Sequence, residues 1–373
     1  MTHGPRMQRQ EGEPAEYLPI GVDALPRSRW VRWALAFGLL AFAALFVIAD
    51  LGQLWAVVAQ ANGWLLILAL VCMVASYLTM ARSYQGIAEA AGCPVPLGEM
   101  LKITFVANAV NYLLSTGGLS GFAVRMYFFT RLGIPSQTAV IISLAQTFLT
   151  NCTLLVFLLG GFAYVLASGT LHGSALVITT TLLVLCALGA AMAALLLLHA
   201  GLRRRTLFRL AQVAHWAMHS AWPHRAPART HIWRYQFNLN RGIGFLLARK
   251  RAMRGPLAYI ALDWLFTILI LYTAFLAVHY AIPFGHVIVG FAVGITLSFA
   301  SLIPGGLGVM EGSMAAVFTS MGVPFETAVV AVLIFRVAYY LVPLLISLFF
   351  LHGMYVQGAS IGRELSESET GGR

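Results

Sequence analysis

The sequence predicts an all-α polytopic membrane protein with about six full spans and two re-entrant helical hairpins, eight hydrophobic segments or more in all. Two observations predict this fold class. Hydrophobic residues make up 60% of the 373 residues and charged residues only 10%, whereas a soluble domain has roughly 25% charged residues. The apolar residues also come in runs of about 20, the length that a helix needs to cross a hydrocarbon core. The runs lack the polar–apolar alternation of barrel strands.

Basic residues set the expected orientation of the spans, because cytoplasmic loops of membrane proteins are enriched in Lys and Arg. Arg27, Arg29 and Arg32 place the N-terminus in the cytoplasm, and the alternation of spans then places the C-terminus there. The expected location is a bacterial-type cytoplasmic (inner) membrane. The full spans are expected at residues 31–49, 64–81, 137–165, 174–199, 256–281 and 326–351.

The net charge of +11 is concentrated in one segment. Twelve of the 24 Lys and Arg residues lie between Arg203 and Arg254, where there is no Asp or Glu. Anionic lipid headgroups are the expected partner of such a segment at a membrane surface, and nucleic acid is not expected. We therefore expect residues 201–255 to form a basic cytoplasmic loop with amphipathic helices.

Residues 97–131 are expected to form a re-entrant hairpin that opens to the cytoplasm. Basic residues place both of its ends on the same side of the membrane. Its two apolar pieces, 101–114 and 119–130, are each too short to cross easily. Gly117 and Gly118 lie between them and break the helix.

Residues 287–321 repeat this pattern and are expected to form a second hairpin. Two short apolar pieces are separated by Pro304, Gly305 and Gly306. The preceding span leads outward, so this hairpin is expected to open to the outside.

An internal repeat relates the two hairpins. Gly-Gly-Leu from Gly117 is followed by G-I-P-S-Q-T-A-V from Gly133, and Gly-Gly-Leu from Gly305 is followed by G-V-P-F-E-T-A-V from Gly322; the offsets are 188 and 189 residues. Paired interrupted segments in two halves of inverted topology are typical of secondary transporters, where they mark the binding site. A duplicated scaffold without transport is the alternative.

The chain is thus expected to divide into five parts. These are a disordered cytoplasmic tail (1–26), a first membrane half (27–200), the basic loop (201–255), a second membrane half (256–352) and a cytoplasmic tail (353–373).

Two charged residues in the second half are candidate site residues. Glu311 lies in the second hairpin and Arg336 lies within the last span. Charges inside a membrane are costly unless they are paired, protonated or hydrated, so we expect these two to pair. The pair either fixes the hairpin or forms a headgroup or proton site.

Polar residues of the first half are further candidates. Arg125 is expected to meet a phosphate or to reach the membrane interface. Asn108 and Asn111 share one helical face, and either line a polar cavity or bond between helices. Asp263, in the first span of the second half, is expected to pair with the basic loop.

No catalytic residue, metal site or cofactor is expected. The four cysteines are scattered, with no CxxC motif or Cys/His cluster. His215 and His219 have the spacing of two ligands on a helix, but no third ligand is evident.

The motif from Pro304 to Glu311 (P-G-G-L-G-V-M-E), followed by R-V-A-Y-Y-L-V-P from Arg336, resembles the membrane region of lysylphosphatidylglycerol synthases. The resemblance covers most of residues 30–351. In larger relatives this region is thought to move an aminoacylated lipid between leaflets, while a separate soluble domain makes that lipid. Only a short tail follows here, so synthase activity is not expected.

The resemblance implies a "flippase-like" protein. Its stand-alone members are associated with hopanoid or polyprenyl-linked lipid pathways. Site roles carry over to Glu311 and Arg336 directly and to Arg125 more loosely. Relatives often have an acidic residue where this chain has Phe122, so a two-carboxylate mechanism is not implied.

Two functions are compatible with these observations. The first is a lipid translocase that moves a polar-headgroup lipid between leaflets. The second is a membrane scaffold or accessory subunit that docks a lipid-biosynthesis or cell-envelope enzyme through the basic loop.

Overall fold

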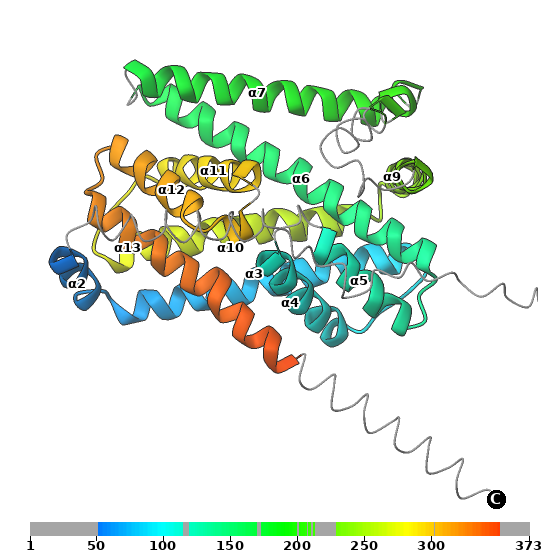
Figure 1. The fold of residues 1–373 in the computed structure, drawn as a ribbon, viewed down its shortest axis with the longest axis horizontal. Coiled ribbons are helices and arrows are strands. Elements are labelled where there is room, and N and C mark those ends of the chain that lie inside the picture. The colour runs from blue at the N-terminus through cyan, green and yellow to red at the C-terminus, as the bar shows by residue number, and fades with distance from the viewer. Residues whose placement is uncertain are drawn as a thin grey trace, which may run out of the picture.

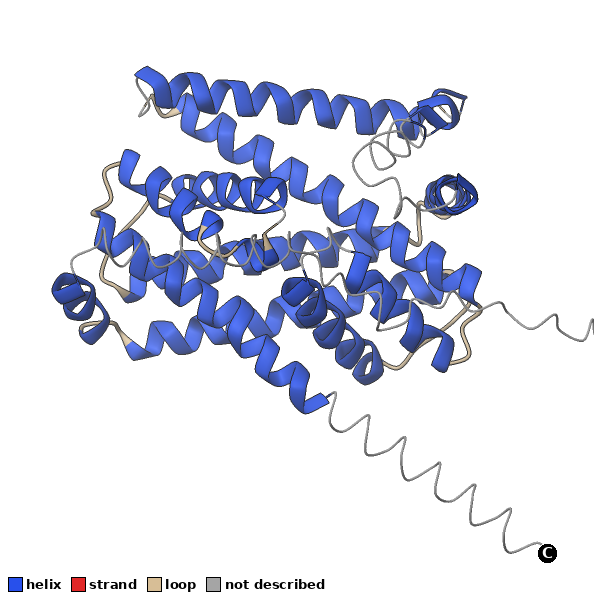
Figure 2. Cartoon of the chain, in the orientation of Figure 1, coloured by secondary structure: helices blue, strands red, loops and turns tan. Residues whose placement is uncertain are grey.

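The structure is a computed structural model that describes residues 51–114, 119–169, 173–199, 201–206, 208–209, 212, 229–301 and 303–350. Within these ranges the regular elements are all helices, as Figure 2 shows. This confirms the all-α class. The expected span 31–49 and the tails 1–26 and 353–373 lie outside the described residues.

Four of the described helices are long and apolar enough to cross a membrane. They coincide with four of the six expected spans. The helices are α3 (Gly63–Ala90), α6 (Ser136–Ala167), α10 (Arg254–Ala277) and the helix Phe325–Phe350.

The last of these helices has an internal irregularity. It begins as α13 (Phe325–Arg336), passes through a π-helical turn, η3 (Val337–Leu341), and continues to Phe350. A fifth helix, α7 (Gly173–Leu198), coincides with the expected span 174–199. The total of six full spans stays a prediction.

Pairs of shorter helices occupy the segments expected as hairpins. In the first half these are α4 (Leu97–Leu114) and α5 (Leu119–Arg131), which pack on each other. In the second half they are α11 (Phe284–Ser301) and α12 (Val309–Ser320), joined through the turn η2 (Pro304–Gly306). Both predicted pairs of short helices are confirmed.

Each pair returns to the end of the molecule at which it began. For the first pair, Val95 and Ile134 lie in the same buried cluster. For the second pair, the hydroxyl of Tyr280 donates to the carbonyl oxygen of Gly322 at 3.3 Å. Figure 1 shows the two pairs toward opposite ends of α3 and α10.

The repeated G-I-P and G-V-P segments have the same local structure. Gly133 and Gly322 have φ of 77° and 89°, the left-handed conformation that glycine adopts without steric cost. The next residues, Ile134 and Val323, donate backbone hydrogen bonds five residues back, which closes the preceding helix. A proline with ψ of 136° then starts the next long helix in each case.

Helices α3 and α10 form the most extensive helix contact, and they run antiparallel. Asn62 at the start of α3 donates its backbone N–H to Ala277 at the end of α10. In the middle, Ser76 bonds Asp263. Toward the other end, Gly86 lies against the ring of Pro256.

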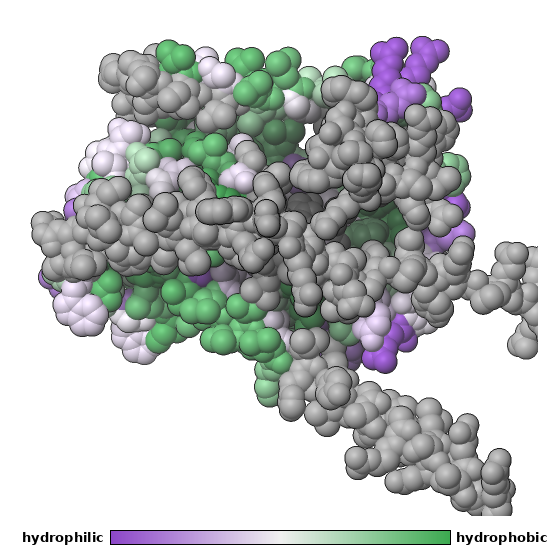
Figure 3. Space-filling view, viewed as in Figure 1, coloured by the Kyte–Doolittle hydropathy of each residue, from purple (hydrophilic) through white to green (hydrophobic). Residues whose placement is uncertain are grey.

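Two more described helices pack against the long helices. Helix α2 (Leu51–Ala59) contacts α13, and α9 (Arg229–Ala248) contacts α6. Helix α9 lies in the basic segment, which was expected to contain amphipathic helices. Figure 3 shows hydrophilic side chains gathered at the right-hand end of the molecule and apolar side chains over much of the rest.

Candidate functional site

The second helix break adopts a conformation that requires its glycines. Gly305, Gly306 and Gly308 have φ of 61°, 62° and 76°. A Cβ on Gly306 would lie 1.9 Å from the hydroxyl oxygen of Ser298, so another residue would be both strained and obstructed. The helical backbone is thus interrupted at residues 304–306, the segment where the sequence predicts a break.

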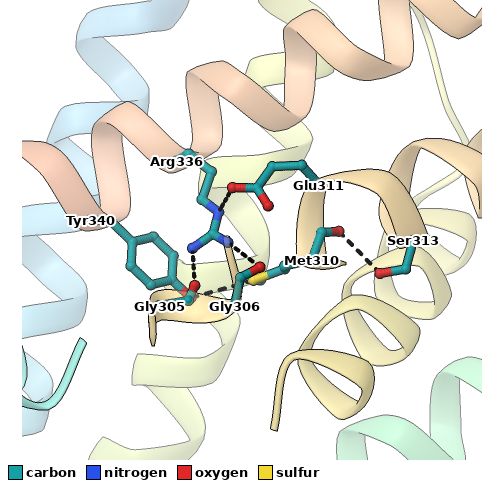
Figure 4. A network of polar contacts seen from close by, with 7 residues as sticks. All are labelled: Gly305, Gly306, Met310, Glu311, Ser313, Arg336 and Tyr340. Carbon is teal, nitrogen blue, oxygen red and sulfur yellow. Dashed lines mark hydrogen bonds and ion pairs between the residues drawn. The ribbon is translucent and has the colours of Figure 1, made fainter. Parts of the chain in front are cut away.

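Glu311 and Arg336 form an ion pair across this break. The Nε of Arg336 lies 2.6 Å from Oε1 of Glu311, and the side chains are 11% and 3% exposed. Glu311 stands in the first turn of α12, where the unpaired N–H groups of a helix favour a carboxylate. The predicted pairing is confirmed (Figure 4).

Arg336 also binds the backbone of the break. Its two terminal nitrogens donate to the carbonyl oxygens of Gly305 and Gly306, at 2.8 and 3.2 Å. The guanidinium lies over the ring of Tyr340, 4.3 Å from the ring centre. One side chain therefore neutralises a buried carboxylate and donates hydrogen bonds to two backbone carbonyl groups of the break.

The second oxygen of the Glu311 carboxylate is not used. Oε2 is buried and has no hydrogen-bond partner among the described residues. Buried carboxylate oxygens normally accept hydrogen bonds, so this atom is the open position of the pair, available to a donor or to a proton.

Tyrosines connect this pair to the first hairpin, and sequence reasoning missed them. The ring centres of Tyr340 and Tyr112 lie 4.5 Å apart, and Tyr339 lies next to both. The signal was present in the sequence, because Tyr339 and Tyr340 follow Arg336 at helical spacings of three and four residues. The aromatic groups place α4 of the first half directly beside the site of the second.

Arg125 is buried separately from the ion pair. Its side chain lies on α5 and its guanidinium carbon is 5.3 Å from the ring centre of Tyr84 on α3. The residue is 8% exposed, and its Nε has no hydrogen-bond partner among the described residues. No Asp or Glu in the described part of the chain forms an ion pair with it. Arg125 is therefore buried and does not reach an exposed position at the membrane interface. Its positive charge has no acidic partner among the described residues.

The two asparagines of α4 have different surroundings. Asn108 donates from Nδ2 to the sulfur of Met80 on α3, at 3.0 Å. Asn111 faces α5 at Gly121. A Cβ added to Gly121 would lie only 3.0 Å from the Cβ of Asn111. Its Oδ1 is buried without a described partner. Gly117 and Gly118, the predicted break of this hairpin, lie outside the described residues.

The prediction that Asp263 pairs with the basic loop is wrong. Asp263 is 3% exposed and accepts a hydrogen bond of 2.6 Å from the hydroxyl of Ser76 on α3. The reason is its position in the middle of the α3–α10 contact rather than at a helix end. Spacing along the sequence gave no signal for a partner 187 residues away.

The described residues contain no group of three or more His, Cys, Asp or Glu side chains that could hold a metal ion. Cys72, Cys93, Cys152 and Cys186 are free thiols. His215 and His219 lie outside the described residues.

Comparison with known proteins relates the chain to a family of membrane regions. A family model described as "Lysylphosphatidylglycerol synthase TM region" matches residues 30–347. A segment of 86 residues is 36% identical to a phosphatidylglycerol lysyltransferase of Staphylococcus haemolyticus, and a segment of 85 residues is 34% identical to a UPF0104 membrane protein of Methanothermobacter thermautotrophicus. Each match covers 23% of this chain, but only 10% and 24% of those relatives.

Proposed function

The chain belongs to the family of lysylphosphatidylglycerol synthase TM regions, which match it over residues 30–347, and from this premise we propose that it is a lipid translocase. With its four long apolar helices it is a multi-pass membrane protein. The proposed substrate is a lipid with a polar headgroup, which passes between the leaflets at the interface of the two halves. The proposal assigns no chemical step to this chain.

The proposal includes two repeats of inverted topology. The order of helices is the same in both halves, and a shift of 189 residues carries α3, α4, α5 and α6 onto α10, α11, α12 and α13 to within three residues at their starts. The antiparallel contact of α3 with α10 supports the inversion, because these two are corresponding helices. The proposed topology has cytoplasmic termini and one hairpin opening to each side.

The observation that carries the proposal is the buried pair of Glu311 and Arg336 at the second break. A broken helix inside a membrane is tolerated where protein or a polar cavity covers it, and intramembrane charges there mark transport pathways. The unpartnered Oε2 of Glu311 is the proposed contact for a donor on the headgroup.

Arg125 is the proposed contact for the phosphate of the lipid. A guanidinium binds phosphate through parallel hydrogen bonds, and this one is buried without an acidic partner in the described ranges. Asn108 and Asn111, on the facing helix, are proposed to line the same path. The basic segment is proposed to contact anionic headgroups at the membrane surface.

The test uses proteoliposomes that contain phospholipids with a fluorescent acyl chain and an impermeant reductant outside. The wild-type protein is expected to move labelled lipid from the inner to the outer leaflet, where the reductant abolishes its fluorescence. Glu311→Gln is expected to abolish this movement. Glu326→Gln is the matched control, since it makes the same change in the first turn of α13. Normal movement by the Glu311→Gln variant would contradict the assigned role.

The same experiment separates the scaffold alternative. A scaffold moves no lipid, and deletion of residues within the basic segment 203–254 removes a bound enzyme without unfolding the helices. Two results together would favour the scaffold. The protein would move neither phosphatidylglycerol, phosphatidylethanolamine nor a polyprenyl phosphate, and the deletion would release a bound partner enzyme.

A further inference from the structure

Asp263 is a buried carboxyl group at the contact between the two halves, and the proposed lipid site does not use it. It is the only Asp or Glu in α3 and α10 apart from Glu89 near the end of α3. Asp263 is 3% exposed. No described residue forms an ion pair with it.

Its immediate partners are hydroxyl groups. The Oγ of Ser76 donates to Oδ1 of Asp263 at 2.6 Å, and lies 3.3 Å from the hydroxyl oxygen of Thr267. Ser76 and Thr267 are fully buried. Thr267 follows Asp263 by four residues and so shares its helix face. Hydroxyl groups both donate and accept hydrogen bonds, so this group of three residues accommodates a carboxylate or a carboxylic acid.

The carboxyl group lies far from both ends of its helix. Asp263 is the tenth of 24 residues in α10, and Ser76 is the fourteenth of 28 in α3. At a rise of about 1.5 Å per residue, Asp263 is about 14 Å or more from either end of α10. An ionised carboxylate at this depth is costly unless it is paired or hydrated.

The groups that face Asp263 do not supply a compensating charge. Four tyrosines interact electrostatically with Asp263: Tyr77 and Tyr84 of α3, Tyr112 of α4 and Tyr339 of η3. Of the nearby cations, Arg82 of α3 donates to Gln85 and Arg125 of α5 lies over Tyr84. Helices α6 and α11, which also pack on α10, contain no Asp, Glu, Lys or Arg; their titratable side chains are Cys152, Tyr164 and His286. Arg336 and Glu311 neutralise each other.

We propose that Asp263 is a proton-binding site whose protonation closes the contact between the two halves, so that lipid movement is coupled to a proton. In the closed contact the group is a neutral carboxylic acid bonded to Ser76. When the halves separate and water reaches it, the O–H bond breaks and the proton leaves to that water, on the side that is then open. The coupling rests on the proposed lipid translocation, whereas the proton site does not.

The proton site is tested by infrared difference spectroscopy of the purified protein in lipid nanodiscs. The wild type is expected to show the C=O band of a protonated, buried carboxylic acid at neutral pH, and this band is expected to disappear at alkaline pH. Asp263→Asn should lack the band, Asp263→Glu should restore one, and Glu311→Gln should retain it. A neutral-pH spectrum that Asp263→Asn leaves unchanged would overturn the proposal.

The coupling is tested in vesicles of phosphatidylethanolamine and phosphatidylglycerol that carry acyl-labelled phosphatidylglycerol. A pH gradient is expected to change the wild-type rate of lipid movement several-fold, and Asp263→Asn is expected to lose this response. Ser83→Ala is the control, because it removes a buried hydroxyl of α3 that bonds Gln146 rather than Asp263. This variant should keep the response to the pH gradient.

The remaining outcomes separate the two proposals. If the wild-type rate of lipid movement does not change with the pH gradient, the proposed coupling is wrong but the proposed translocation is not contradicted. If the rate of lipid movement instead responds to a sodium gradient at constant pH, the oxygen atoms around Asp263 bind a metal cation, and the proposed proton coupling is wrong. Absence of any lipid movement contradicts translocation and the coupling together, and the infrared band then decides the proton site by itself.

Discussion

At the scale of single residues, Arg336 combines three interactions. It pairs with Glu311, donates to two carbonyl groups of the break and covers the ring of Tyr340. A buried ion pair contributes little net stability relative to apolar residues, but the loss of one partner leaves the other charge uncompensated. The break is therefore expected to depend on Arg336 more than on Glu311, because Arg336 binds both the carboxylate and two carbonyl groups of the break.

We predict that Arg336→Gln destabilises the protein by about 3–5 kcal/mol, the range for an uncompensated buried charge. Glu311→Gln is expected to cost less, since glutamine keeps an oxygen that accepts from Arg336. Denaturant unfolding in mild detergent measures both. The double variant should lose less than the sum of the single losses, and strict additivity would show that the two side chains are not coupled.

The glycines of the break give a second prediction at this scale. Gly306→Ala should be strongly destabilising for two reasons. The new Cβ would clash with the side chain of Ser298, and alanine would have to adopt the left-handed backbone conformation of Gly306. Gly322→Ala is the control, since its φ is also positive but nothing lies within 4 Å of its Cβ; it should cost only about 1–2 kcal/mol. Thermal unfolding midpoints compare the two, and equal losses would exclude the steric explanation.

At the scale of elements, glycines set how closely the helices approach. Gly290 and Gly294 of α11 lie under Phe318 and Met314 of α12, which makes the second pair compact. Membrane helices associate largely through such close packing of small residues. Longer apolar helices are hydrophobic around their whole circumference, so small residues, rather than an apolar stripe, decide which faces meet.

Adjacent glycines of α6 test this packing. Gly161→Ala should destabilise the protein by about 1–3 kcal/mol, because its Cβ would lie 2.3 Å from Ile288 of α11. Gly160→Ala adds the same atom where nothing lies within 4 Å, and should be neutral or stabilising by up to about 1 kcal/mol. Unfolding of both variants in the same detergent is the measurement. A loss for Gly160→Ala would argue against the arrangement of α6 and α11.

At the scale of the whole molecule, the α3–α10 contact joins the two proposed halves. The corresponding contacts recur on each side of it: α9 lies on α6 in one half, and α2 lies on α13 in the other. The charged site does not recur. Glu311 corresponds to Phe122 in the repeat, so the two hairpins differ in chemistry although their helices correspond.

The proposed topology predicts which turns are reached from each side. In a cysteine-free background, single cysteines at Leu132 and Lys250 should react with an impermeant maleimide only from the cytoplasmic side. Cysteines at Ser168 and Ser320 should react only from the outside. Labelling of intact cells and of inverted vesicles distinguishes the sides. Reaction of Leu132 and Ser320 from the same side would contradict the inversion.

The sequence by itself determined the membrane class, four long helices, both short-helix pairs and the second break. These features are local: run length decides whether a helix can span, and glycine and proline decide where it stops. The pairing of Glu311 with Arg336 was also predictable, because two opposite charges in apolar segments have few alternatives.

Only the tertiary structure decided which faces meet. It joined Asp263 to Ser76 rather than to the basic loop, brought Tyr112 to Tyr340, and kept Arg125 apart from the ion pair. The physical reason is that helices apolar on all sides show no preferred face in their sequence. The contacts depend instead on how small and large side chains fit together across elements far apart in the chain.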